Sequence, residues 1–227
     1  MAKSEFKLPT CPVDHPDCHW LPQLSLLRQE NEELKLLVTM DPLTGLYNYR
    51  FFRQSLEIEL SCSNRSARPT SLMMIDLDHF KSINDQWGHE VGNLALQNAA
   101  RVFNQTLRQS DIICRYGGEE FAVILPQTAL PLAVNVAERL RQNLEQTAVE
   151  FDGNEIYVTA SIGVGVYQRS NEFTAESFVE ATDGYMYQAK KQGRNQVCHA
   201  AFESTESQTA VSADERAALF SPMDEDE

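Results

Sequence analysis

The chain lacks an excess of positive charge. Its 227 residues carry 19 Lys and Arg against 33 Asp and Glu, a formal net charge of −14. Proteins that bind nucleic-acid polymers present a basic stripe to the phosphate backbone, and this sequence shows none. We therefore expect no nucleic-acid polymer as a partner, and a phosphate-bearing small ligand would have to be bound by a few local cations.

Long apolar runs and a disulfide framework are also missing. No apolar run approaches the length of a membrane span, and the N-terminus lacks the hydrophobic region of a signal peptide. The five cysteines are odd in number and scattered, which fits a reducing compartment better than a set of disulfides. These absences predict a soluble cytoplasmic protein without a membrane partner. An apolar content of 42% is sufficient for one domain with a proper core.

What the chain does have is an acidic hairpin, in the segment DIICRYGGEEFAVIL at 111–125. Two apolar runs flank Gly117-Gly118, which predicts a two-residue β-hairpin with a type I′ turn at the two glycines. Glu119 and Glu120 follow directly. Two carboxylates beside buried strands repel each other and are costly to desolvate, and a bound cation would remove that cost. The alternative is a solvated hairpin tip that happens to be acidic.

A second acidic group follows a strand. The continuous apolar run at 71–75 is typical of a central strand covered on both faces, and it ends in Asp76-Leu77-Asp78. Carboxylates at the end of a buried strand are in the usual place for a metal or phosphate site. If this strand and the hairpin are neighbours in one sheet, their carboxylates converge. The result would be an all-oxygen site suited to Mg²⁺.

These segments together resemble the GGDEF-domain diguanylate cyclases. The matching blocks are DPLTGLYN, IDLDHFKSINDQWGH, GGEEF and AKKQGRN, in the family's order and spacing, from about Asp41 to about His199. The resemblance implies an α/β (α+β) sandwich, a ferredoxin-like nucleotide-cyclase palm with a central, mostly antiparallel sheet. It also implies an enzyme that condenses two GTP into cyclic di-GMP and two pyrophosphates. We expect this catalytic domain over 41–201.

The resemblance assigns roles to individual residues. Asp76, the Leu77 carbonyl and Glu119 would hold Mg²⁺ (or Mn²⁺), with Glu120 a second metal ligand or the base for the 3′-hydroxyl. Gly117 and Gly118 would let the nucleotide lie against bare backbone. The triphosphate would be bound by three cations, Lys81, Lys190 and Arg194. Lys81 would also be catalytic. The remaining substrate contacts would come from Phe80, Asn84, His89 and Asn93. For each cation the alternative is a solvated surface charge.

Guanine recognition is where the chain departs from the family. Where the family has Gly-Asp, this sequence has Gly92-Asn93. An amide accepts a hydrogen bond only as a neutral partner, so a charge-assisted bond to the base is lost. Weaker GTP binding, altered purine choice or a nearly inactive enzyme are the open alternatives. In the last case the protein would be a receptor for cyclic di-GMP.

A second nucleotide site is implied just before the hairpin. Arg108 and Asp111 match the family's RxxD inhibitory site, and Arg139 looks like the second arginine supplied by a neighbouring domain. Arginine can fork onto guanine N7 and O6, and aspartate accepts from guanine N–H groups. Cyclic di-GMP bound there would be both product and inhibitor. The alternative is a salt bridge between residues three apart at a helix end.

Two segments precede the predicted domain. Residues 1–20 contain Cys11, His15, Cys18 and His19, which could clasp Zn²⁺, although the spacing matches no finger pattern and a proline-rich lead-in is the alternative. Residues 21–40 predict one helix with a heptad seam. Its positions are Leu24, Leu27, Asn31, Leu34 and Val38. We expect a parallel homodimer through this helix; the alternative is that it packs on its own domain.

The remaining elements follow from periodicity. Helices are predicted over 49–60, from 79, and over 90–108, 129–147 and 173–192, with a loop at 61–69 and later strands at 156–166 and 196–199. Gly163 and Gly165 predict a bulge or a close backbone approach. The tail from 202 to 227 is acidic and is predicted to be disordered.

Overall fold

The computed structural model describes residues 23–24, 26–27, 39–168 and 173–202. The predicted Cys/His segment, most of the heptad seam and the acidic tail lie outside these residues, so those predictions stay untested. Gln23, Leu24, Leu26 and Leu27 are helical. None of the described helices combines the length and hydropathy needed to cross a membrane. Of the cysteines in the described residues, Cys62, Cys114 and Cys198 form no disulfide.

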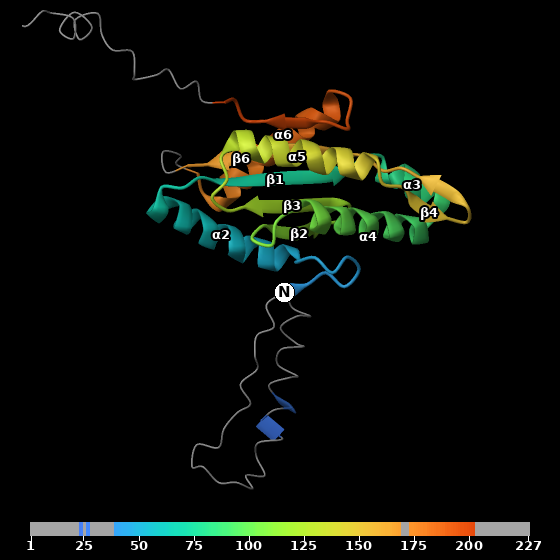
Figure 1. Cartoon of the computed structure of the whole chain (residues 1–227), viewed down its shortest axis with the longest axis horizontal. Coiled ribbons are helices and arrows are strands. Elements are labelled where there is room, and N and C mark those ends of the chain that lie inside the picture. The colour runs from blue at the N-terminus through green and yellow to red at the C-terminus, as the bar shows by residue number, and fades with distance from the viewer. Residues whose placement is uncertain (1–22, 25, 28–38, 169–172, 203–227) are drawn as a thin grey trace, which may run out of the picture.

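A five-stranded sheet forms the centre of the described structure (Figure 1). Its order is β2-β3-β1-β6-β7, made of β1 (Thr70–Leu77), β2 (Ile112–Gly117), β3 (Glu120–Leu125), β6 (Ala160–Tyr167) and β7 (Val197–His199). β1 is antiparallel to both of its neighbours, and β7 alone is parallel to β6. Every residue of β1 is buried. The predicted α+β sandwich with a mostly antiparallel sheet and a covered central strand is confirmed.

Five helices cover the two faces of the sheet. One face packs on α3 (Phe80–Trp87), α4 (His89–Thr106) and α5 (Leu130–Glu145), around a core that includes Ile75, Phe103 and Phe121. The other packs on α2 (Tyr49–Ser66) and α6 (Ala175–Lys191), around Leu72 and Met74. Alternate residues of each strand therefore serve opposite cores, as the two-residue period of a strand requires.

Glycine lets α6 approach the sheet closely. A Cβ on Gly163 would lie 2.3 Å from both the Met186 nitrogen and the Thr182 carbonyl oxygen, and a Cβ on Gly165 would lie 2.4 Å from Thr182 Oγ1. The predicted close backbone approach is confirmed. Any larger residue at position 163 would have to push the α6 backbone away.

The predicted turn type at Gly117-Gly118 is wrong. Gly117 is the last residue of β2 and pairs with Glu120, so the two central residues of the turn are Gly118 and Glu119. Of these only Gly118 has positive φ, +54°, whereas a type I′ turn needs positive φ at both central positions. The turn is thus one residue later than predicted: β2 continues through Gly117, and Glu119, the first carboxylate of GGEEF, lies in the turn.

A second hairpin was not predicted. The segment at 156–166, predicted as one strand, contains the end of β5 (Asn154–Ile156), a three-residue connection and most of β6. β5 pairs with β4 (Val149–Phe151) in a separate sheet of two strands. Asp152 and Gly153 connect β4 to β5 with φ of +48° and +75°. Asp-Gly is the strongest short hairpin signal, and the sequence contained it. The predicted loop at 61–69 is also wrong in part, because α2 continues to Ser66.

We predict that Gly163→Ala destabilises the chain by at least about 2 kcal/mol, since overpacking against backbone cannot be relieved by a rotamer change. The matched control is Gly184→Ala, at an exposed position of α6 where nothing lies within 4 Å of the added Cβ. That variant should gain about 0.5–1 kcal/mol from helix propensity. Urea denaturation of both variants measures the difference. Equal stabilities would contradict the close approach of α6.

Candidate active site at the end of β1

The structure brings the two acidic groups together at one end of the sheet. Asp76 on β1 and Glu120 on β3 are directly opposite each other across the two antiparallel strands. The Leu77 backbone N–H donates to the Glu119 carbonyl oxygen over 3.3 Å, so the hairpin tip is bonded back to the end of β1. Asp76, Glu119 and Glu120 therefore meet in the way that the two motifs predict for neighbouring strands.

Asp76 forms an ion pair with Lys190. Its Nζ lies 2.7 Å from Asp76 Oδ2, and the side chain of Asp76 is only 12% exposed. Burial raises the pKa of Asp76 above its usual value, the Lys190 ammonium opposes that rise, and the charges of Glu119 and Asp78 add to it. One ammonium group shared among several carboxylates leaves the site short of positive charge.

Glu120 experiences the same shortage. Burial and then the charge of Asp76 raise its pKa, Lys190 opposes this, and Asp183 and Glu119 raise it further. Glu120 also lines a cavity of about 430 Å³ between α2 and α6, next to Tyr116 and Asp183. Its carboxylate is therefore partly desolvated but open to solvent on one side, a combination suited to receiving a cation or a proton.

The oxygen atoms at this end of the sheet fit Mg²⁺ as a partial shell. Within the described residues, no three Asp, Glu, His or Cys side chains are arranged to hold an ion by themselves. Mg²⁺ is usually held by one or two carboxylates while water and substrate phosphates supply the remaining ligands. The carboxylates of Asp76 and Glu120, crowded and short of countercharge, match that donor set.

Two of the predicted phosphate-binding cations are unengaged. Lys81 lies exposed on α3, and Arg194 lies exposed in the loop between α6 and β7. Over the described part of the chain, neither the Lys81 ammonium nor the Arg194 guanidinium forms a hydrogen bond or an ion pair. Both are thus available to an anionic ligand, in contrast to Lys190.

The predicted base-binding residues come from the junction of α3 and α4. Gly92 lies directly beneath Asn84: a Cβ there would be 2.0 Å from Asn84 Oδ1 and 3.3 Å from Phe80 Cζ. The glycine therefore leaves room for the amide and the aromatic ring together. His89 begins α4, and Asn93 is exposed one residue beyond Gly92.

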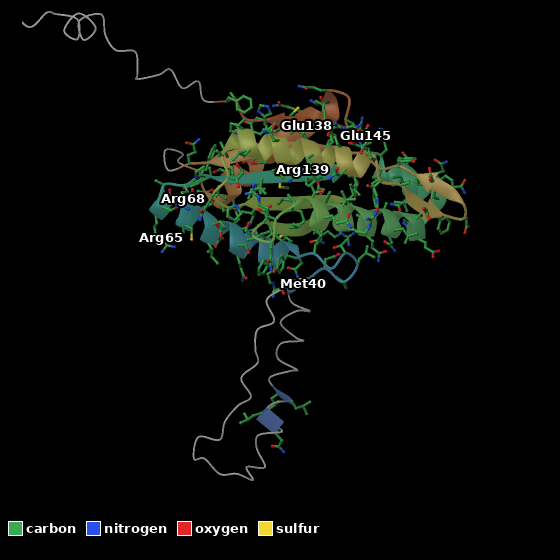
Figure 2. All side chains as sticks on the ribbon, viewed as in Figure 1. Met40, Arg65, Arg68, Glu138, Arg139 and Glu145 are labelled. Atoms are coloured by element: carbon green, nitrogen blue, oxygen red, sulfur yellow. The ribbon has the colours of Figure 1, made fainter. Side chains whose placement is uncertain are left out.

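Arg108 and Asp111 form a turn between α4 and β2, away from the carboxylates. The Arg108 N–H donates to Asp111 Oδ2 over 2.9 Å, and the Asp111 N–H donates to the Arg108 carbonyl over 3.0 Å. Both residues line a cavity of about 460 Å³ that Met40 and Tyr47 also line. Arg139 on α5 (Figure 2) donates to the carbonyl of Thr106, the last residue of α4, over 2.9 Å.

Sequence reasoning missed Arg115, which holds the hairpin tip. Its Nε and Nη2 donate to the Gly118 carbonyl over 3.0 and 2.8 Å, and its Nη1 lies 3.2 Å from both oxygens of Asp41. Although burial opposes it, hydrogen bonds from Thr44 and the Arg115 guanidinium hold the pKa of Asp41 below its usual value. The available signal was an arginine two residues before Gly-Gly, long enough to reach over the turn.

We predict that Glu120→Gln does not destabilise the metal-free protein at pH 7.5. Because folding raises this pKa from its ordinary 4.5, the folded chain binds more protons than the unfolded chain in the pH range between the two values. The contribution of Glu120 to the free energy of unfolding therefore falls as pH rises through that range. Glutamine does not ionise, so the variant does not lose this stability. Its advantage over wild type should shrink towards pH 4.5.

Urea denaturation in EDTA at both pH values checks this, with Glu150→Gln, at the exposed position of β4, as the matched control. A glutamine variant at position 120 that is clearly less stable than wild type at pH 7.5 would contradict the assigned electrostatics.

Comparison with known proteins finds similarity to one family. A family model described as "Diguanylate cyclase, GGDEF domain" matches residues 38–196. A curated relative, diguanylate cyclase A of Treponema denticola, is 38% identical over 177 residues, which is 77% of this chain and 47% of the relative. The chain thus spans about half the length of that relative. It spans 38% of the length of another, diguanylate cyclase DosC of Escherichia coli.

Solved structures give the same result. The coiled coil and GGDEF domain of DgcB from Caulobacter crescentus, in complex with c-di-GMP, superposes with a TM-score of 0.74 at 27% identity, covering 79% of this chain and 94% of that one. Diguanylate cyclase SiaD from Pseudomonas aeruginosa, in complex with its activator SiaC, gives 0.70 at 37% identity and covers 79% and 68%.

Proposed function

The chain belongs to the GGDEF-domain family of diguanylate cyclases, and on that premise we propose that it condenses two GTP into cyclic di-GMP. In this reaction each 3′-hydroxyl attacks the α-phosphorus of the other nucleotide. A P–O bond forms to each attacking oxygen, the bond to pyrophosphate breaks, and each hydroxyl gives up its proton. The observation that carries the proposal is the crowding of Asp76 and Glu120 beside a single ammonium group.

The metal is part of this proposal. Asp76, the Leu77 carbonyl, Glu119 and Glu120 would hold Mg²⁺ or Mn²⁺, which would neutralise charge on the phosphoryl oxygens. Glu120, whose pKa is raised, suits the role of base for the 3′-hydroxyl. Lys190 neutralises Asp76 in the structure. In the proposed complex its ammonium group binds a phosphate instead, together with Lys81 and Arg194.

The nucleotide would lie across the end of the sheet. Its guanine would enter the α3–α4 junction beside Phe80, Asn84 and His89, and its phosphates would pass over Gly117 and Gly118. Asn93, exposed beside this junction, takes the position where the family has an aspartate. Its neutral amide favours an alternative proposal, a cyclase with altered purine choice or a weakly active protein that serves as a cyclic di-GMP receptor.

Two copies of the chain must meet for this reaction, because each nucleotide attacks the other. We propose a parallel homodimer through the N-terminal helix. Leu24 and Leu27, both on the predicted seam, are 42% and 60% exposed in the single chain, which leaves apolar surface for a partner to cover. The similar DgcB structure is described as containing a coiled coil. The compartment we propose is the cytoplasm, where GTP is available.

We predict that Glu119→Gln and Glu120→Gln each lower pyrophosphate release from GTP at least about a hundredfold, the size of a lost acid–base or electrostatic contribution. The assay uses purified full chain, Mg²⁺ and GTP. Glu150→Gln is the matched control and should keep wild-type turnover. Turnover unchanged by both active-site variants would refute the assigned mechanism.

Product inhibition is the second testable part of the proposal. We propose that cyclic di-GMP binds Arg108, Asp111 and Arg139, next to the cavity that the first two residues line. Arg108→Ala is the informative change, because it keeps the backbone N–H that Asp111 accepts, whereas changing Asp111 would break the turn.

We predict that Arg108→Ala raises the concentration of cyclic di-GMP needed for half-inhibition at least about tenfold, the effect of one lost charge-assisted bond. Initial turnover should stay as in wild type. Arg101→Ala, on the preceding helix α4 with only local contacts to Asn98 and Gln105, is the control. Inhibition that survives in Arg108→Ala would remove this site from the proposal.

A further inference from the structure

Asp78 stands apart from the carboxylates described above although it is only two residues from Asp76. It is 4% exposed. Its Oδ1 accepts from Ser161 Oγ over 2.6 Å, and its Oδ2 accepts from Thr159 Oγ1 over 2.8 Å and from the Asn195 N–H over 3.0 Å. Three donors occupy this carboxylate, so Asp78 connects the end of β1 to the segment before β7.

The segment that Asp78 holds contains two residues in an unfavourable conformation. Arg194 and Asn195 have φ of +65° and +45°, in the left-handed region. Asparagine tolerates this region, but for arginine it is unfavourable, so the surrounding contacts must impose it. Such strain is typical of segments whose geometry serves a site.

Asn195 is also fixed from the opposite side, by α5. Its Nδ2 donates to Glu145 Oε1 over 2.8 Å, and its Oδ1 accepts from Arg141 Nη1 over 2.8 Å. Arg141 is itself bound between Glu138 and Glu145, at 2.9 Å from each. Figure 2 shows both glutamates on α5. Asn195 thereby joins the loop to Asp78, which directly follows β1, and to α5.

The residue whose direction these contacts decide is Arg194. Its N–H donates to the Ala189 carbonyl at the end of α6, while its guanidinium makes no hydrogen bond or ion pair within residues 39–168 and 173–202. Ala189 directly precedes Lys190, whose ammonium contacts Asp76. The backbone of Arg194 is therefore fixed, while its guanidinium is free to bind an anionic ligand.

We propose that Asp78 and Asn195 are positioning residues that hold the backbone at Arg194 so that its guanidinium meets the triphosphate. The inference rests on the proposed function, since Arg194 needs a phosphate ligand there. The two aspartates of Asp76-Leu77-Asp78 would then have different roles. Asp76 faces the metal and Lys190, and Asp78 never touches the nucleotide and acts only through the loop.

The test measures binding of 3′-deoxy-GTP, which lacks the attacking hydroxyl, to the full chain with Mg²⁺ by calorimetry. Arg194→Ala should weaken binding by about tenfold to a hundredfold, the range for one charge-assisted hydrogen bond. Asp78→Asn replaces the charged acceptor of the Asn195 N–H with a neutral amide, so the charge-assisted hydrogen bond is lost, and binding should weaken by about tenfold. In the Arg194→Ala background, Asp78→Asn should change the dissociation constant by less than about twofold.

Binding of GMP separates positioning from general damage. GMP lacks the β- and γ-phosphates, so neither variant should alter its affinity by more than about twofold. Ser161→Ala is the matched control, because it removes one donor from Asp78 but leaves the bond to Asn195. It should bind 3′-deoxy-GTP as wild type does. If Asp78→Asn does not fold, Asn195→Gly is the second variant, because it keeps the left-handed backbone and loses the contacts to α5. It should weaken binding of 3′-deoxy-GTP but not of GMP.

Each outcome is decisive. The positioning role is overturned if Asp78→Asn weakens the binding of GMP and of 3′-deoxy-GTP equally. It is also overturned if the effect of Asp78→Asn on 3′-deoxy-GTP binding adds in full to that of Arg194→Ala. In both cases the proposed function stands. If wild type does not bind 3′-deoxy-GTP at all, the proposed function fails and this inference fails with it.

Discussion

Asp76 and Glu120 face each other across two neighbouring strands, and each carboxylate is held where its negative charge is unfavourable. Most of the described structure can be understood from this constraint. A chain that needed only stability would place apolar residues at the end of a buried strand, because burying like charges is costly. Retaining them makes sense if a divalent cation and a triphosphate complete the site.

The surrounding structure serves to hold this charge arrangement in place. Gly163 and Gly165 let α6 lie close to the sheet, which brings Lys190 to 2.7 Å from Asp76. Arg115 bonds the hairpin tip and, through Asp41, connects it to the segment that precedes α2. The proposed role of Asp78 would do the same for Arg194 on the other side of the site. Each of these contacts joins elements far apart in the sequence.

Much of the fold could be predicted because its signals are local. The apolar run of β1, the helical periodicities and the glycines of β6 each depend on neighbouring residues, and the convergence of Asp76 with Glu120 followed once two strands were taken as neighbours. The β4–β5 hairpin was missed although Asp152-Gly153 signalled it, because a three-residue strand carries too little pattern. Arg115 and Asn195 were missed for another reason. Although the reach of Arg115 over its own turn was a local signal, its partner Asp41 lies 74 residues away. Asp78 lies 117 residues from Asn195, and no local pattern selects such distant partners. The metal-ligating, base-binding and inhibitory roles, and the dimer, rest on family resemblance and stay predictions.

The most direct measurement is the mass of the products that the purified chain forms with Mg²⁺ from GTP, from ATP and from their mixture. We predict cyclic di-GMP from GTP alone and none in EDTA, which would also mean that Asn93 tolerates guanine. An adenine-containing product would contradict GTP as the substrate and make Asn93 a specificity determinant. No product, together with tight binding of cyclic di-GMP that Arg108→Ala abolishes, would contradict the enzyme and identify a receptor.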